Sequence, residues 1–528
     1  MVGMKSFRSP PPVVKLINAF ARPFENAVAT ARTCYSGKGI IWPEEVSGDG
    51  EPDDKRQKRV EQRDRIARST YEAGHHTTLQ HAHFQFTLEN VSRQFLWSFL
   101  HSHPFYNSEQ VSQRFVEVRP DFFAVPPLDG EALAVYRAAL EQQQAAYRRL
   151  IDLLMAPAAR EYYRIFPARK KVSARYDKDV KKKAQEIARY ALPVATFAYL
   201  YHTVSGITLL RYYRLCQQLD APTETRLVVT RMVEEVLRHD PLYQTILEDP
   251  LPLEATPEYE HFQAHAFTPD VEFIREFDRS LSGYTSRLVD HKPGNEACVA
   301  QAVREVLGIS RARLDDETAI RRALDPAENK LFGESMNLTS LSKLSRALVH
   351  ASYTFRKKLS HTADSQDQRH RMTPASRPLL MAHMTGEPDY VVPELLRHSA
   401  PARELYDDTM ARTWAAIARL RGLGVADEFA AYLLPNAVCV RMTESADFLN
   451  LHHKLKSRLC YTAQEEIWRA SLDEARQVRD VNPVLGRYLL PPCGLRLMTQ
   501  TRPLCPEGDR YCGVPVWKLT IDQYSRVI

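Results

Sequence analysis

The chain has 528 residues, of which 44% are hydrophobic and 26% charged, with a formal net charge of +6. This length exceeds what one ordinary hydrophobic core supports, so two to four domains are expected. No apolar run approaches the roughly 20 residues of a membrane span, and the first residues lack the apolar core of a signal peptide. The mild basicity suits an anionic small ligand as well as a nucleic acid, but no nucleic-acid-binding module is recognisable. The eight scattered cysteines favour reduced thiols. We therefore expect a cytoplasmic protein with neither membrane nor nucleic acid as partner.

Three elements are predicted in the first half. Residues 81–90 alternate apolar and polar side chains, which is typical of a half-buried strand. Residues 91–102 then predict a helix, with Ser92 in position to cap it. Residues 131–155 carry the apolar spacing of a long amphipathic helix. The first half is thus expected to form a mixed α+β domain.

Matching segments in the two halves indicate an internal duplication. Leu192-Pro193 is followed by an Arg-Leu-Cys end at Cys216, and Leu434-Pro435 is followed by the same end at Cys460. Upstream, we pair Ser92-Arg93 with Ser345-Arg346. A proline-rich stretch near the middle is interpreted as a linker. The predicted organisation is a first repeat at 13–250, a linker at 251–270, a more diverged second repeat at 271–480, and a Cys/Pro-rich extension at 481–528.

The first repeat also carries an ordered series of short motifs. Gly74-His75 precedes the strand, Val91-Ser92-Arg93 follows it, and Ser112-Gln113-Arg114-Phe115 comes after the helix. This order resembles the signature region of flavin-dependent thymidylate synthases. Their pattern continues from Val-Ser-Arg through a helix to an Arg-His-Arg triplet, and then to Asn-Glu-x-Ser-x-Arg-aromatic. The resemblance implies an α+β fold with two tandem domains of the thymidylate-synthase-complementing type, each a small antiparallel sheet with long helices.

Both repeats depart from this family pattern. In the first repeat, His101-Ser102-His103 stands where the family has its triplet. In the second, the pairing above places Thr354-Phe355-Arg356 at the triplet. The polar segment 360–378 then replaces the later motif, with Ser365 or Asp367 in the place of the family serine and Arg369 in that of its arginine. Asp364 or Asp367 beside His361 or His370 could also form a base and its orienting group.

The resemblance implies reductive methylation of dUMP to dTMP, with FAD as cofactor, methylene-tetrahydrofolate as donor and NADPH as reductant. The alternative is a nucleotide-binding paralogue that has lost flavin chemistry. Because family sites form between subunits, one repeat could supply the nucleotide arginines and the other the flavin contacts. A homodimer would then act as a pseudo-tetramer.

The resemblance also implies three groups of site residues. Arginines are the informative members because a guanidinium offers planar, bidentate donors to phosphate or a uracil carbonyl, although surface ion pairing is the simpler interpretation of each. The expected catalytic residues are Arg214, Arg458, Ser365 and Arg369. The expected substrate-binding residues are Ser112, Arg114, Arg189, Gln368 and Arg371. The expected cofactor-binding residues are His75, His101, His103, Asn107, Glu109 and Arg356.

Four of the eight cysteines lie in the last 69 residues, at Cys460, Cys493, Cys505 and Cys512. The Pro/Gly-rich sequence around them is typical of a metal-bound knuckle, and four thiolates could hold zinc or an iron–sulfur cluster. However, the spacing lacks the tight Cys-x-x-Cys pairs of common sites. Free thiols and no metal are therefore the default prediction, with coordination as the alternative.

Overall fold

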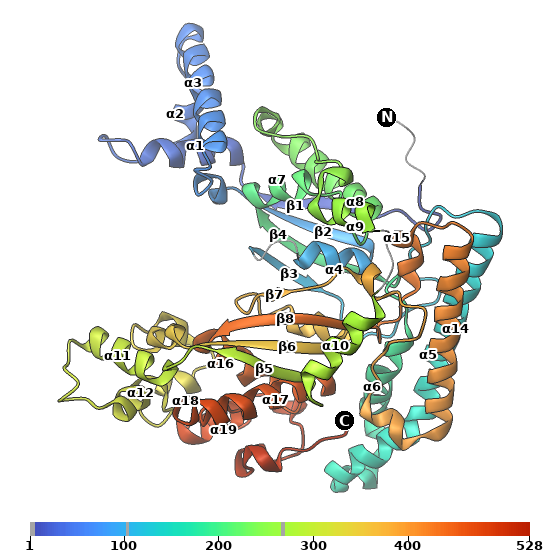
Figure 1. Cartoon of the computed structure of the whole chain (residues 1–528). Helices are drawn as coiled ribbons and strands as arrows, with labels where there is room; N and C mark the ends of the chain where they lie inside the picture. The colour runs from blue at the N-terminus through green and yellow to red at the C-terminus, as the bar shows by residue number, and fades with distance from the viewer. Residues whose placement is uncertain (1–5, 102–104, 266–269) are drawn as a thin grey trace. The chain divides into compact units, whose positions relative to one another are not determined.

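The computed structural model describes residues 6–101, 105–265 and 270–528 (Figure 1). Its contacts divide the chain into two units. Unit 1 comprises residues 1–141, 193–268 and 415–434, and unit 2 comprises residues 142–192, 269–414 and 435–528. Within the described residues, no helix is long and apolar enough to cross a membrane.

Unit 1 is built on a four-stranded antiparallel sheet in the order β1-β2-β4-β3. Phe84, Phe86 and Leu88 on β2 are fully buried and alternate with more exposed residues, as the sequence pattern predicts. The Ser92 hydroxyl accepts a 2.9 Å hydrogen bond from the Phe95 N–H, so the predicted cap of the next helix is confirmed. The strands are β1 (Val13–Ala19), β2 (His83–Ser92), β3 (Tyr106–Gln110) and β4 (Phe197–Ser205).

Helices cover the buried face of this sheet, with α8 packed against β1 and β2 and α7 against β4. The principal helices are α4 (Arg93–His101), α7 (Gly206–Arg214) and α8 (Pro222–His239). The others are α1 (Pro23–Thr33), α2 (Pro43–Ser47), α3 (Asp53–Glu72), α9 (Pro257–His265) and α15 (Asp427–Ala430). Helix α9 occupies part of the segment interpreted as a linker.

Unit 2 repeats this plan with a sheet in the order β5-β6-β8-β7 (Figure 1). Its strands are β5 (Ser286–His291), β6 (Ser352–Ser360), β7 (Ala375–Ser376) and β8 (Cys439–Asp447). The helices equivalent to α4, α7 and α8 are α13 (His361–Asp367), α16 (Phe448–Arg458) and α17 (Glu465–Val481). The others are α6 (Asp177–Ala188), α10 (Val271–Leu281), α11 (Asn295–Leu307), α12 (Asp316–Leu324), α18 (Pro483–Gly486) and α19 (Pro492–Met498).

Two long helices complete the fold. Helix α5 (Gly130–Ile165) extends the predicted amphipathic helix by one residue at its start and ten at its end, and its counterpart in the second repeat is α14 (Ala400–Gly422). Two tandem copies of one α+β plan, each with a small antiparallel sheet, confirm the predicted fold class and the duplication.

The structure corrects one pairing between the repeats. Ser92 ends β2 and caps α4, and the residue that ends β6 and caps α13 is Ser360. Ser345 lies instead at the start of a short 3-10 helix, Ser345–His350, ahead of β6. The pairing of Ser92-Arg93 with Ser345-Arg346 was therefore wrong, because a shared dipeptide outweighed the strand pattern that fixes the register.

Each unit contains a segment of the other repeat. Unit 1 takes residues 415–434 from the second repeat, and unit 2 takes residues 142–192 from the first. Two of the five unit boundaries fall at the Leu-Pro steps, Leu192-Pro193 and Leu434-Pro435. Backbone hydrogen bonds fix the incoming segments: the Ala195 N–H donates to the Tyr432 carbonyl at 2.9 Å, and the Ala437 N–H to the Tyr190 carbonyl at 3.0 Å. Neither unit is therefore made from one repeat alone.

Candidate functional site

A buried glutamate joins the strand end to the exchanged segment in each unit. In unit 1, the Ser92 N–H and hydroxyl donate to the two carboxylate oxygens of Glu224, at 2.8 and 2.6 Å, and the Tyr432 hydroxyl donates to the same carboxylate. Burial raises the pKa of Glu224, and the hydrogen bonds from Ser92 and Tyr432 oppose that rise. The network fixes the residue that begins α4.

Unit 2 repeats the network with different residues. The Ser360 hydroxyl donates to Glu466 at 2.6 Å, and the Tyr190 hydroxyl donates to the same oxygen at 2.6 Å. Each tyrosine comes from the repeat that does not supply the serine. The sequence contained both tyrosines, but nothing in their spacing indicated this role.

The motif after α4 is held in unit 1 by Arg93. Its guanidinium donates to the Gln110 side chain at 2.7 Å and to the Val111 carbonyl at 2.8 Å. Ser112 follows directly and its hydroxyl accepts a 3.3 Å bond from the Arg114 N–H. The Arg114 guanidinium lies 5.3 Å from the centre of the Phe115 ring. The family's Ser-x-Arg-aromatic step is thus part of an ordered loop at the end of β3.

The other candidates of the first repeat are dispersed. Asn107 and Glu109 project from the same face of β3 and are exposed, and His75 is exposed in the turn after α3. Ser102 and His103 lie outside the described residues, as does the side chain of His101. Their predicted roles in flavin binding remain predictions.

When Ser360 is paired with Ser92, the second repeat contains an intact Arg-His-Arg triplet. Counted from Ser92 and Ser360, positions 101–103 correspond to Arg369-His370-Arg371, and Ser98 corresponds to Gln366. The family's glutamine is therefore present within α13, and its Arg-His-Arg triplet follows the helix. This signal was visible in the sequence and was missed because of the Ser345 pairing.

Two expectations change with this register. Thr354-Phe355-Arg356 lies within β6, where Phe355 is buried, so its placement at the triplet was wrong. Ser365 lies on α13, ahead of the triplet, and its hydroxyl donates to the His361 carbonyl at 3.3 Å. Neither Ser365 nor Asp367 thus takes the place of the family serine, and Arg369 takes a triplet position instead of the later arginine.

Arg458 and His370 form the best-ordered contact at the triplet. Arg458 Nε donates to His370 Nε2 at 3.0 Å, while its other nitrogens donate to the Gln366 carbonyl at 2.7 Å and the Gln366 side chain at 3.3 Å. Burial, then Arg458 and Lys454, lower the pKa of His370 to about 2. The imidazole is therefore neutral and accepts from Arg458. Arg369 is exposed and Arg371 half-buried.

The repeats retain complementary parts of the family pattern. Ser108 on β3 and Ala375 on β7 occupy equivalent positions, as do Phe123 and Tyr390 in isolated bridges further on. Because no residue is inserted between these two anchors, Ser112 and Arg114 correspond to Leu379 and Met381. The second repeat has thus lost the Ser-x-Arg step, and the first has lost the triplet.

The remaining arginines differ in environment. Arg189 is buried, with its Nε donating to the Glu186 carbonyl at 3.1 Å. Arg214 is paired with Glu248 at 3.0 Å on the surface. Arg214 and Arg458 both end equivalent helices, but α16 is two residues longer than α7. Two residues turn a helix by about 200°, so the two side chains leave their helices in different directions.

A fully buried charge cluster lies beside the triplet segment. Lys357 Nζ is 2.7 Å from Glu474, 2.8 Å from Glu444 and 3.3 Å from Asp367. Lys454 Nζ is 2.6 Å from Asp367 and also contacts Glu444. Burial, then Asp367, raises the pKa of Glu444 to about 7, while its two lysines oppose the rise. Asp367 is two residues from Arg369, so the cluster anchors the base of the triplet.

Unit 1 fills the same positions with apolar and aromatic side chains. The residues equivalent to Lys357, Asp367, Glu444, Lys454 and Glu474 are Leu88, Phe99, His202, Tyr212 and Met232, all buried. Phe99 lies 4.7 Å from both the His202 and the Tyr212 ring. The repeats therefore share a backbone plan but not the chemistry of this part of the core, and sequence periodicity did not predict the charged version.

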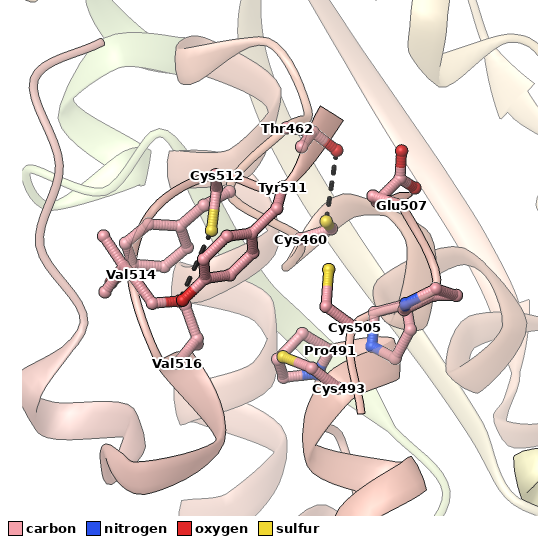
Figure 2. Close-up of a pocket in the computed structure, with 13 residues that line it drawn as sticks. Cys460, Thr462, Pro491, Cys493, Cys505, Glu507, Tyr511, Cys512, Val514 and Val516 are labelled. Atoms are coloured by element: carbon pink, nitrogen blue, oxygen red, sulfur yellow. Dashed lines mark hydrogen bonds between the residues drawn. The ribbon is translucent and has the colours of Figure 1, made fainter. Parts of the chain in front are cut away.

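The donors of the second repeat fit a flavin nucleotide. Arg369 and Arg371 are accessible cations next to Gln366, an amide with both donor and acceptor atoms, and this set suits phosphate and a heterocycle edge. The four C-terminal cysteines converge separately, on one pocket of unit 2 (Figure 2).

Two antiparallel sheets of identical order, each with a capping serine and a buried glutamate, define a duplicated domain. The family model for the thymidylate synthase complementing protein matches this chain twice, over residues 15–242 and 287–484, and the chain belongs to that family. A flavin-dependent thymidylate synthase from Geobacter sulfurreducens is 30% identical over 230 residues, which is 43% of this chain and 92% of the relative. One from Clostridium tetani is 27% identical over 231 residues, covering 43% and 83%. A solved structure of a UMP/dUMP methylase from Streptomyces cacaoi covers 49% of this chain and 96% of its own, with 19% identity and a TM-score of 0.30.

Proposed function

We propose that this chain is a flavin-dependent methyltransferase that converts dUMP to dTMP. The observation that carries the proposal is the Arg369-His370-Arg371 triplet with Gln366, at the end of α13 where the family pattern requires it. FAD would supply the hydride chemistry, a methylene-folate the carbon, and NADPH the reducing equivalents. The names of the relatives from Geobacter sulfurreducens and Clostridium tetani support the reaction class.

The residues of this chain would bind and orient. Arg369 and Arg371 would pair with phosphate, and a guanidinium does this bidentately. Neutral His370 would hold Arg458 in position by accepting its hydrogen bond. In the first repeat, Ser112 and Arg114 would contact dUMP. Because each motif survives only once, the chain would need both repeats for one reaction, and we further propose that it acts as a homodimer.

An absorbance titration with FAD and dUMP tests the proposal. The wild type should bind FAD and shift its flavin band when dUMP is added. Arg369→Ala should weaken FAD binding by roughly 10-fold or more, since a charge-assisted hydrogen bond contributes about 1.5–3 kcal/mol. Its thermal midpoint should stay near that of the wild type because Arg369 is exposed.

Arg356→Ala is the matched control. Arg356 is also exposed and lies in the same repeat, but on β6, with its guanidinium 5.7 Å from the Phe277 ring. The Arg356→Ala variant should bind FAD like the wild type. Equal losses in both variants would refute the register. A wild type that ignores FAD but binds dUMP would instead support a nucleotide-binding paralogue.

Turnover then distinguishes one shared reaction from two independent ones. Arg114→Ala and Arg369→Ala should each abolish dTMP formation. If each repeat carried its own complete site, each variant would keep about half the wild-type rate, because the other repeat would continue to work.

A further inference from the structure

The C-terminal extension brings three cysteines to a fourth in the second repeat. Cys460 follows α16 in the repeat, Cys493 lies in the first turn of α19, and Cys505 and Cys512 lie in the irregular segment after it. All four line one pocket (Figure 2). The family match ends at residue 484, so this convergence is a property of the extension and not of the repeats.

The surroundings of these thiols are largely apolar. Pro491, Pro492, Val514 and Val516 form much of the wall. The four cysteines are free, so no disulfide accounts for their proximity. Four partly buried thiols are costly to ionise together unless a cation lies among them.

Two hydrogen bonds orient the outer thiols. Cys460 Sγ lies 3.1 Å from the Thr462 hydroxyl, and the Cys512 thiol donates to the Val514 carbonyl at 3.5 Å (Figure 2). Hydrogen bonds from hydroxyl groups to a ligand sulfur are a usual feature around metal-bound thiolates. Once Cys460 is deprotonated, the Thr462 hydroxyl can only donate to it.

Zinc and an iron–sulfur cluster require different arrangements of the four cysteine sulfurs. Zinc requires four sulfurs at about 2.3 Å from one point. Among the described His, Cys, Asp and Glu side chains, no group of three or more is placed to hold a metal ion. An iron–sulfur cluster has a different demand, because its cysteines bind different iron atoms and surround a volume filled by iron and sulfide.

We propose that Cys460, Cys493, Cys505 and Cys512 bind an iron–sulfur cluster. On assembly each thiol loses its proton to solvent and forms one iron–sulfur bond, with ferrous iron, ferric iron and inorganic sulfide as the supplied components, so that no net electron transfer is needed. The cluster would tie the extension to the end of α16. That helix also carries Arg458, which contacts His370 of the triplet, so cluster binding would stabilise the segment that holds this arginine.

Anaerobic reconstitution of the full chain with equal amounts of ferrous and ferric iron and with sulfide tests this proposal. We expect a broad band near about 400 nm, iron and acid-labile sulfide in equal amounts, and a paramagnetic resonance signal in one redox state. FAD is left out, so failure of the flavin proposal does not affect the result. Serine variants of Cys493 and Cys512 should lose most of the iron, whereas Cys298→Ser, a partly exposed cysteine outside the pocket, should keep the wild-type content.

A measurement on the wild type alone guards against variants that fail to fold. Alkylation followed by mass mapping should show the four pocket cysteines protected after reconstitution and reactive before it, with Cys34 reactive in both states because it is exposed. A reconstituted wild type without iron and sulfide would overturn the proposal. So would uptake of one zinc ion per chain without sulfide, or equal loss of iron in Cys298→Ser.

Discussion

The buried charge cluster of unit 2 gives the sharpest test of the structure. Lys357→Met keeps an unbranched side chain of similar length and removes the ammonium group with its charge and its hydrogen bonds. Asp367 and Glu444 would keep Lys454 as an ionic partner, whereas Glu474 would lose its contact with Lys357. Breaking a buried ion pair by removing one partner costs about 3–5 kcal/mol. We expect that loss in the free energy of unfolding, visible as a lower urea midpoint with an unchanged slope.

A second substitution should recover much of this loss. Glu474→Gln removes one of the excess negative charges, and its amide oxygen can still accept the bond that Glu474 now receives from the Ser286 hydroxyl at 2.9 Å. The double variant should therefore be more stable than Lys357→Met alone by at least about 2 kcal/mol, a coupling within the range for residues in contact. Unit 1 supports this expectation, since it holds Leu88 and Met232 at the two positions.

The cost of Lys357→Met should also depend on pH. The pKa of Glu444 is already raised to about 7, and loss of a neighbouring cation raises it further. Below its raised pKa in the variant, Glu444 is protonated in the folded state, which relieves the repulsion among the buried carboxylates. Above that pKa, Glu444 is ionised and the repulsion destabilises the folded state. The difference between variant and wild type should thus grow as the pH rises above about 7, by up to about 1.4 kcal/mol per pH unit. A pH-independent difference, or a double variant no more stable than the single one, would refute this reasoning.

Two further predictions concern single buried side chains. Tyr432→Phe and Tyr190→Phe each remove one hydrogen-bond donor from a buried glutamate. Each should lower the free energy of unfolding, measured with urea, by about 1.5–3 kcal/mol. No loss would mean that the glutamates are neutral or receive another hydrogen bond in place of the lost one. Burial lowers the pKa of His452 to about 3 in the folded protein, from 6.5 in the unfolded chain. Between these two pH values the unfolded state binds one more proton than the folded state, so the free energy of unfolding falls as the pH falls. Between pH 6.5 and 5, the free energy of unfolding should therefore fall by roughly 2 kcal/mol less in His452→Leu than in the wild type. The same pH dependence in both proteins would show that His452 is already charged in the folded state.

Local patterns predicted the elements well where one face is buried. The alternation of residues 81–90 gave β2 because Phe84, Phe86 and Leu88 point into one core. The cap at Ser92 was equally predictable, since it depends on residues three apart. The triplet at 369–371 was present in the sequence but was assigned wrongly. A dipeptide match at Ser345 was preferred to the strand that ends at Ser360.

Contacts between distant segments were beyond the reach of sequence patterns. Tyr190 and Tyr432 looked like ordinary core residues, and their bonds to Glu466 and Glu224 arise only through the exchange of segments between repeats. The cysteines were found by their number, but their spacing gave no ligand pairs. Only the path of the extension after α18 brings Cys493, Cys505 and Cys512 to Cys460.

The exchange of segments offers a physical reason for the complementary losses. In an assembly of identical chains, every motif must survive in every copy. In a fused chain, the repeats mutate independently, while each unit still requires segments of both to complete its core. Folding therefore preserves shared features such as Ser92, Glu224 and their equivalents Ser360 and Glu466, even where ligand-binding motifs are lost. A motif needs to survive only once per chain, which fits the retention of Arg369-His370-Arg371 in one repeat and Ser112-x-Arg114 in the other.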